Sequence, residues 1–317
     1  MKPSRKAATV RLGVLDVGSN TVHLLVVDAH PGAAPVPSAT HKTVVRLMRF
    51  LTPDGAISDE GVDRITAAIA GAVDAATKED VEELLPFATS ALREATNGAS
   101  VFAHIERATG VSLRVLSGVE ESRLTFLAVR RWYGWSAGRI LLLDIGGGSL
   151  EIASGIDEYP DLATSVPLGA GRSTIGFLPD DPPTSTQVEE LRKHARSVLD
   201  EVSKQFASLD GPDHVVGTSK TFRSLARLAG SSHDGVGPDD RVLLRRSALA
   251  DWVPRLAAIP AEARTALPGI TPERTAQIVA GGIVAEQAMR AFGVREVEIC
   301  PWALREGIIL RRLDELG

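Results

Sequence analysis

The chain has 317 residues with a formal net charge of −5, and 44% of its residues are apolar. This length predicts about two domains, and the composition excludes a chain that is disordered throughout. An aromatic share of 4% and the lack of a basic excess exclude a broad nucleic-acid-binding surface. The single cysteine, Cys300, excludes an intrachain disulfide and favours a cytoplasmic protein, and no apolar run is long enough for a membrane helix.

The first half of the chain alternates strands with helices, which predicts an α/β fold. Residues 1–8 are expected to be a frayed tail, and Ser58 is expected to cap the first long helix. The expected strands lie at 10–15, 22–27, 43–47, 87–89 and 113–116, and the first two form an antiparallel hairpin around a glycine turn. The expected helices lie at 59–77, 91–95, 99–108 and 120–131.

The second half continues the alternation. Thr271 and Pro272 are expected to be the cap and first residue of a long helix. The expected strands lie at 140–143, 151–155, 214–216 and 296–299. A loop is expected at 179–186, and the expected helices lie at 187–206, 219–229, 240–257, 272–292 and 303–316.

Two segments of the chain echo each other. Residues 12–20 (LGVLDVGSN) and 141–149 (LLLDIGGGS) each place an aspartate and a glycine turn after a buried strand. The repeat predicts two related domains that face each other across a cleft. Backbone N–H groups of such a turn can bind phosphate, and a carboxylate at the strand end can hold Mg²⁺ directly or through water. The alternative for either segment is a plain hairpin turn with a capping aspartate.

Other phosphate and metal motifs are missing from the sequence. It contains no Walker loop and no dinucleotide-binding glycine pattern after a strand, and its histidines lack metal-ligand spacing. His23 lies within an apolar strand and is expected to be structural. Cys300 has no evident base partner and is expected to lie in the core.

Six motifs, taken together and in this order, resemble those of the Ppx/GppA family of exopolyphosphatases and guanosine pentaphosphate phosphohydrolases. They are residues 16–21 (DVGSNT), 88–95 (ATSALREA), 117–123 (SGVEESR), 144–151 (DIGGGSLE), 217–219 (GTS) and 303–307 (ALREG). The resemblance spans nearly the whole chain. It implies an actin-like ATPase (ASKHA) superfamily fold of the α/β class, built from two duplicated ribonuclease-H-like domains facing a cleft.

The same resemblance implies the domain limits. The N-terminal domain is expected over 1–122, with the closing helix 303–317 packed back on it, and the C-terminal domain over 123–302. Long family members carry further C-terminal helical domains, so this chain looks like a short form that handles short substrate chains better than very long ones.

The resemblance also implies roles for charged residues. Glu121 matches the catalytic base, with Glu120 as the alternative, because neighbouring glutamates on a helix point in different directions. Asp144 and Glu151 match Mg²⁺-site residues, with Asp16 joining them through water. Arg93 matches a catalytic phosphate ligand, a role that its fork of donors suits.

A further set of residues is implied to bind phosphate. They are Ser19, Asn20, Ser90, Gly146, Gly147, Gly148, Ser149, Gly217, Thr218, Ser219 and Lys220. Lys220 stands where the family usually has glycine, so it could add a cation for a phosphate chain or obstruct a nucleoside base. Further candidates for a substrate channel, each with solvated surface charge as the alternative, are Arg46, Arg49, Arg123, Arg223, Arg227 and Arg305.

These features together predict an Mg²⁺-dependent exopolyphosphatase in which a water attacks the terminal phosphate of inorganic polyphosphate. The alternatives are a guanosine pentaphosphate 5′-phosphohydrolase, an actin-like kinase or ATPase, and a phosphate-binding regulatory module without activity. The expected partners exclude nucleic acid and membrane, and a homodimer is allowed. The cytosol, where phosphate polymers and the alarmones of the stringent response are found, is the expected location.

Overall fold

The structure is a computed structural model that describes residues 9–30, 32–231 and 241–316. The tail expected at residues 1–8 lies outside these residues. The chain divides into two compact units: unit 1 is Met1–Ser117 with Leu304–Gly317, and unit 2 is Gly118–Ala303. The division falls before Gly118, whereas the sequence analysis placed it after residue 122, so the whole helix that carries Glu121 lies in unit 2.

Unit 1 is built on a five-stranded sheet in the order β3-β2-β1-β4-β5. β1 and β2 form the predicted antiparallel hairpin, and β4 is parallel to β1. The strands are β1 (Val10–Val17), β2 (Thr21–Ala29), β3 (Pro37–Val44), β4 (Glu83–Ala88) and β5 (Arg114–Val115). The helices are α1 (Asp59–Lys78), α2 (Ser90–Glu94), α3 (Gly98–Thr109), α10 (Leu304–Leu316) and the 3-10 helix Leu47–Phe50.

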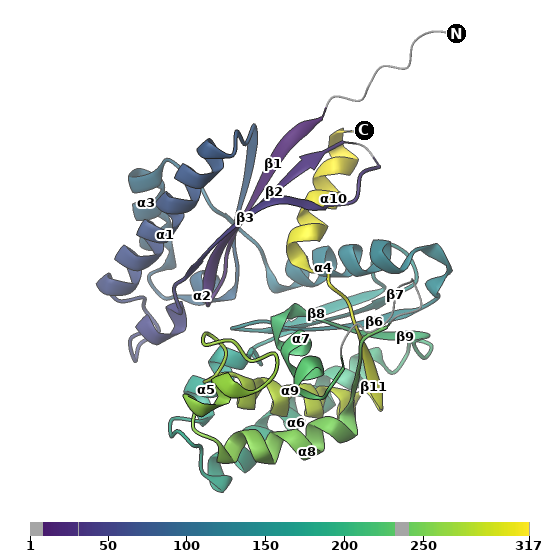
Figure 1. The fold of residues 1–317 in the computed structure, drawn as a ribbon. Coiled ribbons are helices and arrows are strands. Elements are labelled where there is room, and N and C mark those ends of the chain that lie inside the picture. Colours follow the sequence, from purple (N-terminus) through teal and green to yellow (C-terminus); the bar gives the residue numbers. More distant parts are fainter. Residues whose placement is uncertain (1–8, 31, 232–240, 317) are drawn as a thin grey trace. The chain divides into compact units, whose positions relative to one another are not determined.

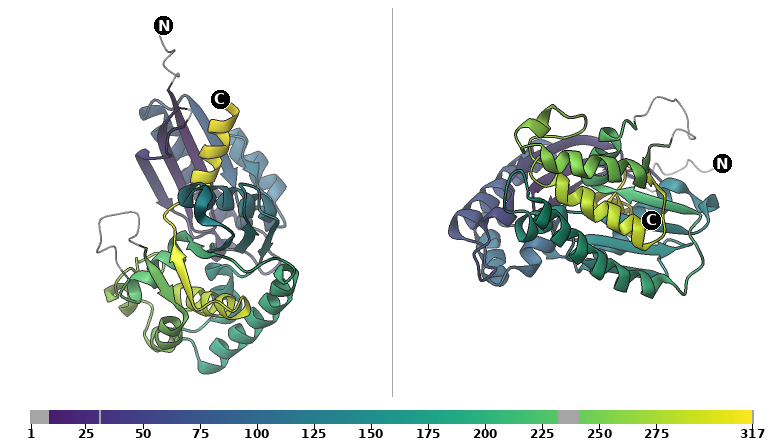
Figure 2. Two further views of the ribbon diagram at one scale, coloured as in Figure 1. Left: turned by 90° about the vertical axis from the view of Figure 1, so that its right-hand side faces the viewer. Right: turned by 90° about the horizontal axis from the view of Figure 1, so that it is seen from below.

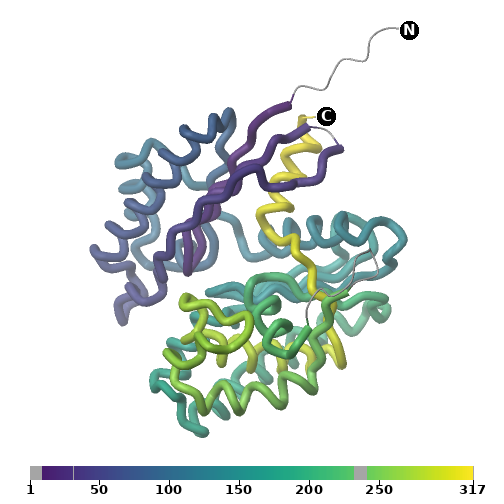
Figure 3. The backbone as a smooth tube through the Cα atoms, viewed as in Figure 1, coloured from purple at the N-terminus to yellow at the C-terminus, as the bar shows by residue number. Residues whose placement is uncertain are grey.

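The two faces of β1 have different neighbours. Leu15 and Val17 belong to the core that α1 and α3 complete on one side of the sheet. Because side chains alternate along a strand, Asp16 points to the other side, where α10 lies beside β1 (Figure 3). Ser58 caps α1 as predicted, since its hydroxyl accepts a hydrogen bond from the Gly61 N–H at 3.4 Å.

Unit 2 is built on a six-stranded sheet in the order β10-β11-β9-β6-β7-β8. β7 is antiparallel to both of its neighbours, β6 and β8, whereas β9 and β11 run parallel to β6. The strands are β6 (Ile140–Ile145), β7 (Leu150–Gly155), β8 (Leu162–Val166), β9 (His214–Thr218), β10 (Leu243–Arg245) and β11 (Glu296–Ile299). The helices are α4 (Gly118–Tyr133), α5 (Ala170–Phe177), α6 (Ser185–Phe206), α7 (Ser219–Leu228), α8 (Arg246–Ala258) and α9 (Ile278–Ala291), with 3-10 helices at Trp135–Ala137 and Ala263–Ala266.

Helices cover both faces of the unit 2 sheet (Figures 1 and 2). Ile140 and Leu142 of β6 pack with Phe126 of α4, in the same cluster as Cys300, which is fully buried as expected. Leu141 and the other odd-numbered side chains of β6 point to the opposite face of the sheet, where they belong to a larger core that α6, α7, α8 and α9 complete. Among the described residues, no helix combines the length and the apolar character needed to cross a bilayer.

The two units repeat one topology. The order β3-β2-β1-β4-β5 of unit 1 corresponds to β8-β7-β6-β9-β11 of unit 2, and β10 is an added edge strand. In both sheets three antiparallel strands are followed by strands parallel to the first of them. This duplication confirms the predicted α/β fold built from two related units.

Three element predictions are wrong. The third strand ends at Val44 instead of spanning 43–47, because Arg46 adopts a left-handed backbone (φ 56°) and a 3-10 helix follows. The helix expected at 240–257 begins only at Arg246, after strand β10, and residue 240 lies outside the described residues.

The long helix expected over 272–292 begins at Ile278, and residues 272–277 form successive turns, so Thr271 and Pro272 do not begin it. Strand β8 and helix α5 were not predicted. All five residues of β8 are half-buried and include small and polar side chains, so the strand lacks the alternation that marks a typical edge.

Candidate functional site

Two buried carboxylates face each other at one end of the unit 2 sheet. Asp144 near the end of β6 is the direct cross-strand partner of Glu151 in β7. Such partners have Cα atoms about 4.5–5.5 Å apart, so the two side chains are neighbours. Asp144 is 9% exposed and Glu151 is 5% exposed. The Ser165 hydroxyl of β8 donates a hydrogen bond to Glu151 Oε1 at 2.8 Å, which holds that carboxylate in place.

The surroundings of this pair favour a bound cation. Burial raises the pKa of Asp144 to about 7, with repulsion from Glu151 adding to the effect and Arg223 and Arg274 opposing it. In the part of the chain that the structure describes, no three His, Cys, Asp or Glu side chains gather as a metal site. Two oxygen donors fit Mg²⁺, which usually keeps several waters and binds through one or two carboxylates together with substrate phosphates.

A glycine turn joins β6 to β7 beside these carboxylates. The N–H of Ala170 donates to the Gly146 carbonyl at 2.9 Å, and the N–H of Arg172 donates to the Gly147 carbonyl at 3.0 Å. Arg172 Nε donates to the Gly148 carbonyl at 2.8 Å. The turn's carbonyls therefore face the start of α5. Because a trans peptide directs its N–H opposite to its C=O, three successive N–H groups point away from α5, as a phosphate-binding nest requires.

Helix α4 brings Glu121 to the same end of the same sheet face. The Ser122 hydroxyl donates to the Ile152 carbonyl at 3.0 Å, next to Glu151 in β7. At the far end of α4, the Tyr133 ring lies 5.4 Å from that of His214, the first residue of β9. The start of α4 therefore lies over the strand ends that carry the carboxylates.

Alternation along the strands supports this placement. Asp144 shares its side of β6 with Leu142, which packs against α4. Glu121 is 4% exposed, whereas Glu120 is half-buried. Of the two glutamates, Glu121 is the one that faces inward.

The segment between β9 and α7 is held mainly by packing. A Cβ on Gly217 would lie 2.7 Å from a Val297 methyl group, so a side chain there has no room. The Thr218 hydroxyl donates to the Trp302 carbonyl at 2.7 Å, which is a contact inside unit 2. Ser219 begins α7 with a left-handed backbone (φ 75°), and Lys220 is half-buried beside it.

Unit 1 has a different pair at the equivalent strand positions. Asp16 of β1 is the cross-strand partner of His23. Arg305 of α10 has Nη1 4.0 Å from Asp16 Oδ2 and also hydrogen-bonds Nδ1 of His23. Because arginine only donates, Nδ1 accepts, and Nε2 carries the proton toward the hydroxyl of Thr40 at 2.5 Å. Burial raises the pKa of Asp16, and the Arg305 charge lowers it.

The polar residues of the unit 1 turn lie close to helix α2. Ser19 and Ser90 are both buried, and their hydroxyls are 3.2 Å apart. Asn20 is 7% exposed, and its carbonyl accepts the N–H of Arg46 at 3.0 Å. Arg93 of α2 donates from Nη1 to the Leu116 carbonyl at 2.6 Å, which ties its guanidinium to the end of β5.

The sequence analysis missed two arginines near the carboxylates. Arg274 Nη1 donates to Thr221 Oγ1 at 3.3 Å, and its charge acts on Asp144. Arg172 holds the glycine turn as described above. Arg274 lies in the segment wrongly expected to be helical, and Arg172 lies in the unpredicted helix α5. Of the other channel candidates, Arg49, Arg123 and Arg227 are exposed.

Comparisons with known proteins identify the family. The family model described as "Ppx/GppA phosphatase family" matches residues 25–316. "Exopolyphosphatase 1" of Mycobacterium tuberculosis is 51% identical over 305 residues, which cover 96% of this chain and 89% of that protein. "Exopolyphosphatase 1" of Mycobacterium leprae is 50% identical, with coverages of 96% and 90%.

Solved structures share the fold. A crystal structure of an exopolyphosphatase from Cytophaga hutchinsonii has a TM-score of 0.85 at 24% identity and covers 97% of this chain and 99% of that chain. A Ppx/GppA family member from Aquifex aeolicus has a TM-score of 0.77 at 23% identity, with the same coverages. With its family motifs, its fold and these relatives in agreement, the chain belongs to the Ppx/GppA phosphatase family.

Proposed function

We propose that the protein is an exopolyphosphatase that removes the terminal phosphate of inorganic polyphosphate in an Mg²⁺-dependent reaction. The observation that carries the proposal is the buried Asp144–Glu151 pair next to a glycine turn whose N–H groups point away from α5. The relatives named exopolyphosphatase 1 share about half of the sequence over nearly the whole chain. Together they favour hydrolysis of a phosphoanhydride over a dead phosphate-binding module.

The metal would be held by Asp144 and Glu151. When bound, Mg²⁺ supplies charge neutralisation on the phosphate oxygens and polarisation of the P–O bond. Asp16 has the cation of Arg305 at 4.0 Å, which disfavours direct coordination of a metal ion by Asp16. This division of roles follows the different partners of the two aspartates.

The glycine turn and the unit 1 turn would bind phosphoryl groups. The N–H groups of Gly147, Gly148 and Ser149 donate to phosphate oxygens at no cost in reorganisation, because α5 already fixes the turn. Ser19, Asn20, Ser90 and Arg93 supply further donors in unit 1, and Ser219 and Lys220 lie at the start of α7 in unit 2. The structural contacts of Gly217 and Thr218 favour a role in shaping the segment.

Glu121 would act as the general base. Its carboxylate accepts a proton from a water as the water oxygen bonds to the terminal phosphorus. The bridging P–O bond breaks, and the shortened chain leaves with the bonding electrons. Orthophosphate and a chain one unit shorter are the products, and no enzyme nucleophile is needed.

The test is phosphate release by Glu121→Gln, with Glu120→Gln as the matched control on the same helix turn. Substrates are tripolyphosphate, long-chain polyphosphate and guanosine pentaphosphate, each with Mg²⁺. We expect Glu121→Gln to lower kcat by about 10²–10⁴-fold with an unchanged melting temperature, and Glu120→Gln to stay within about twofold. Near-normal turnover by a folded Glu121 variant would contradict the base assignment. A kcat/KM that is higher for guanosine pentaphosphate than for both polyphosphates would contradict the substrate.

A further inference from the structure

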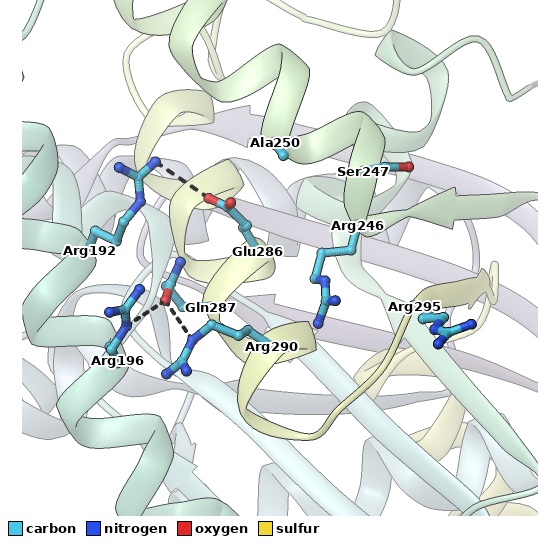
Figure 4. Close-up of a pocket in the computed structure, with 9 residues that line it drawn as sticks. All are labelled: Arg192, Arg196, Arg246, Ser247, Ala250, Glu286, Gln287, Arg290 and Arg295. Atoms are coloured by element: carbon cyan, nitrogen blue, oxygen red, sulfur yellow. Dashed lines mark hydrogen bonds and ion pairs between the residues drawn. The ribbon is translucent and has the colours of Figure 1, made fainter.

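A cavity of about 570 Å³ lies in unit 2 between α6, α8 and α9. Figure 4 shows its lining, in which five arginines surround one carboxylate and one buried amide. The arginines are Arg192, Arg196, Arg246, Arg290 and Arg295, and we call this cavity the arginine pocket. None of these residues has a role in the proposed reaction.

The arginine pocket is separate from the Asp144–Glu151 pair. Arg295 immediately precedes β11, which runs parallel to β9 and β6, so it lies at the edge where these strands begin. Asp144 lies at the edge where they end, and the rise along β6 from Ile140 to Asp144 alone is about 13 Å. The helices that line the pocket also pack on the sheet face opposite to α4.

Two arginines share one neutral acceptor at the base of the pocket. Gln287 is 2% exposed, and its side-chain oxygen accepts from Arg290 Nε at 3.1 Å and from Arg196 Nε at 3.4 Å. One amide oxygen thus orients two guanidinium groups without neutralising either charge. Arg290 also pairs with Asp200 at 2.8 Å.

Among the described residues, three of the five arginines, Arg196, Arg246 and Arg295, have no carboxylate partner, and they leave the pocket cationic. Arg192 pairs with Glu189 at 3.3 Å and with Glu286 at 3.5 Å. Across residues 9–30, 32–231 and 241–316, neither Arg246 nor Arg295 has a side-chain hydrogen bond or ion pair. The two are joined through the backbone, where the Arg246 N–H donates to the Arg295 carbonyl at 2.9 Å. An anion with several charged oxygens would relieve the repulsion among these groups.

We propose that the arginine pocket is a second anion site that binds an inorganic oligophosphate. Guanidinium forks match the geometry of phosphate oxygens, and Arg196, Arg246 and Arg295 offer three of them without a carboxylate partner among the described residues. The volume is in the range of ordinary ligand sites. Among the described residues that line the pocket, none has an aromatic ring on which a nucleobase could stack, which favours an inorganic chain over a nucleotide. The site requires no catalysis and stands independently of the proposed activity.

The test measures binding of tripolyphosphate in EDTA, by calorimetry and by hydrogen–deuterium exchange, with free phosphate assayed in the same samples. The variant is Arg246→Ala/Arg295→Ala. The control, Arg107→Ala/Lys193→Ala, removes the same charge from exposed positions outside the pocket. Tripolyphosphate is expected to slow exchange in peptides from α6, the start of α8 and the end of α9. The variant is expected to lose this protection and to raise the Kd of tripolyphosphate at this site at least tenfold. The Kd of the control is expected to stay within about twofold of the wild-type value.

Three results would overturn the proposal. The first is protection from exchange that is confined to the glycine turn and its neighbours. The second is equal affinity for tripolyphosphate in the wild type and the folded double variant. The third is stronger protection of α6, α8 and α9 by ATP than by tripolyphosphate. If the alanine variant does not fold, Arg246→Lys/Arg295→Lys keeps the charge but removes the fork, and is expected to show weakened binding. Hydrolysis is measured separately with the Glu121 variants, so failure of one proposal is not read as failure of the other.

Discussion

Gly169 controls the position of the glycine turn through a single close approach. A Cβ at this residue would lie 2.3 Å from the Gly148 carbonyl carbon and 2.4 Å from the Ser149 nitrogen, where ordinary contacts are 3.4–4 Å. The backbone of Gly169 is extended (φ −67°, ψ 150°), so alanine is allowed conformationally and only the missing space opposes it. In Gly169→Ala the turn and the start of α5 must separate by about 1 Å.

That separation is expected to reduce activity more than it reduces stability. The hydrogen bonds from Ala170 and Arg172 that fix the turn would lengthen or break, and the three N–H groups would move with it. A displacement of about 1 Å at a reacting centre costs on the order of 10²-fold in rate, and overpacking costs about 1–3 kcal/mol of the free energy of unfolding. We expect kcat/KM for phosphate release from tripolyphosphate to fall about 10²-fold in protein that is still folded at the assay temperature.

The matched control is Gly176→Ala in the same helix. A Cβ at Gly176 meets nothing within 4 Å, and its φ is ordinary for a helix. We expect wild-type kinetics and a gain of about 0.5–1 kcal/mol, because alanine is the better helix former. Steady-state kinetics and thermal unfolding of both variants decide the matter. Wild-type kcat/KM in Gly169→Ala would refute the reasoning that this turn binds the reacting phosphate.

Two further predictions concern metal binding and folding. Saturating Mg²⁺ is expected to raise the melting temperature of the wild type by a few degrees. The melting temperature of the double variant Asp144→Asn/Glu151→Gln is expected not to change. An equal rise in both proteins would show that the metal binds elsewhere. Arg264 is 1% exposed and donates to the carbonyls of Leu256 and Thr275 at 3.1 and 2.7 Å and to Asp181 at 3.1 Å. Arg264→Met is therefore expected to lower the free energy of unfolding, measured in urea, by about 3 kcal/mol. The exposed control Arg107→Met is expected to lower it by less than about 0.5 kcal/mol. Equal midpoints of urea unfolding for the two variants would contradict this prediction.

The unit 2 carboxylate pair could be predicted because local chemistry determines it. A buried strand, a four-residue glycine turn and a returning strand bring Asp144 opposite Glu151 by register alone. The glycine pattern also marks the turn. What the pattern could not reveal is that α5, an unpredicted helix, fixes the turn's orientation through the carbonyls of Gly146 and Gly147.

Tertiary contacts account for the segments that the sequence misled. Residues 272–277 have the proline and the charged residues of a helix start, yet Arg274 reaches Thr221 from a turn, and the helix begins at Ile278. The arginine pocket could not be predicted from the sequence either. Its arginines come from segments separated by up to about a hundred residues, and the sequence around each one alone indicates a solvated charge on a helix or at a strand end.

The duplication explains why one unit carries the candidate metal pair. Both units place an aspartate at the same position of the same strand, on the sheet face that a helix covers. The difference is the cross-strand partner, which is His23 in unit 1 and Glu151 in unit 2.

With Glu151 opposite, burial leaves two neighbouring carboxylates that a bound cation would stabilise. With His23 opposite, Arg305 already supplies the charge, and a divalent ion would have to compete with a guanidinium that is fixed by two contacts. A second full metal site in unit 1 is therefore disfavoured by chemistry although the backbone would allow it. One cross-strand position thus gives two units of the same topology different charge environments.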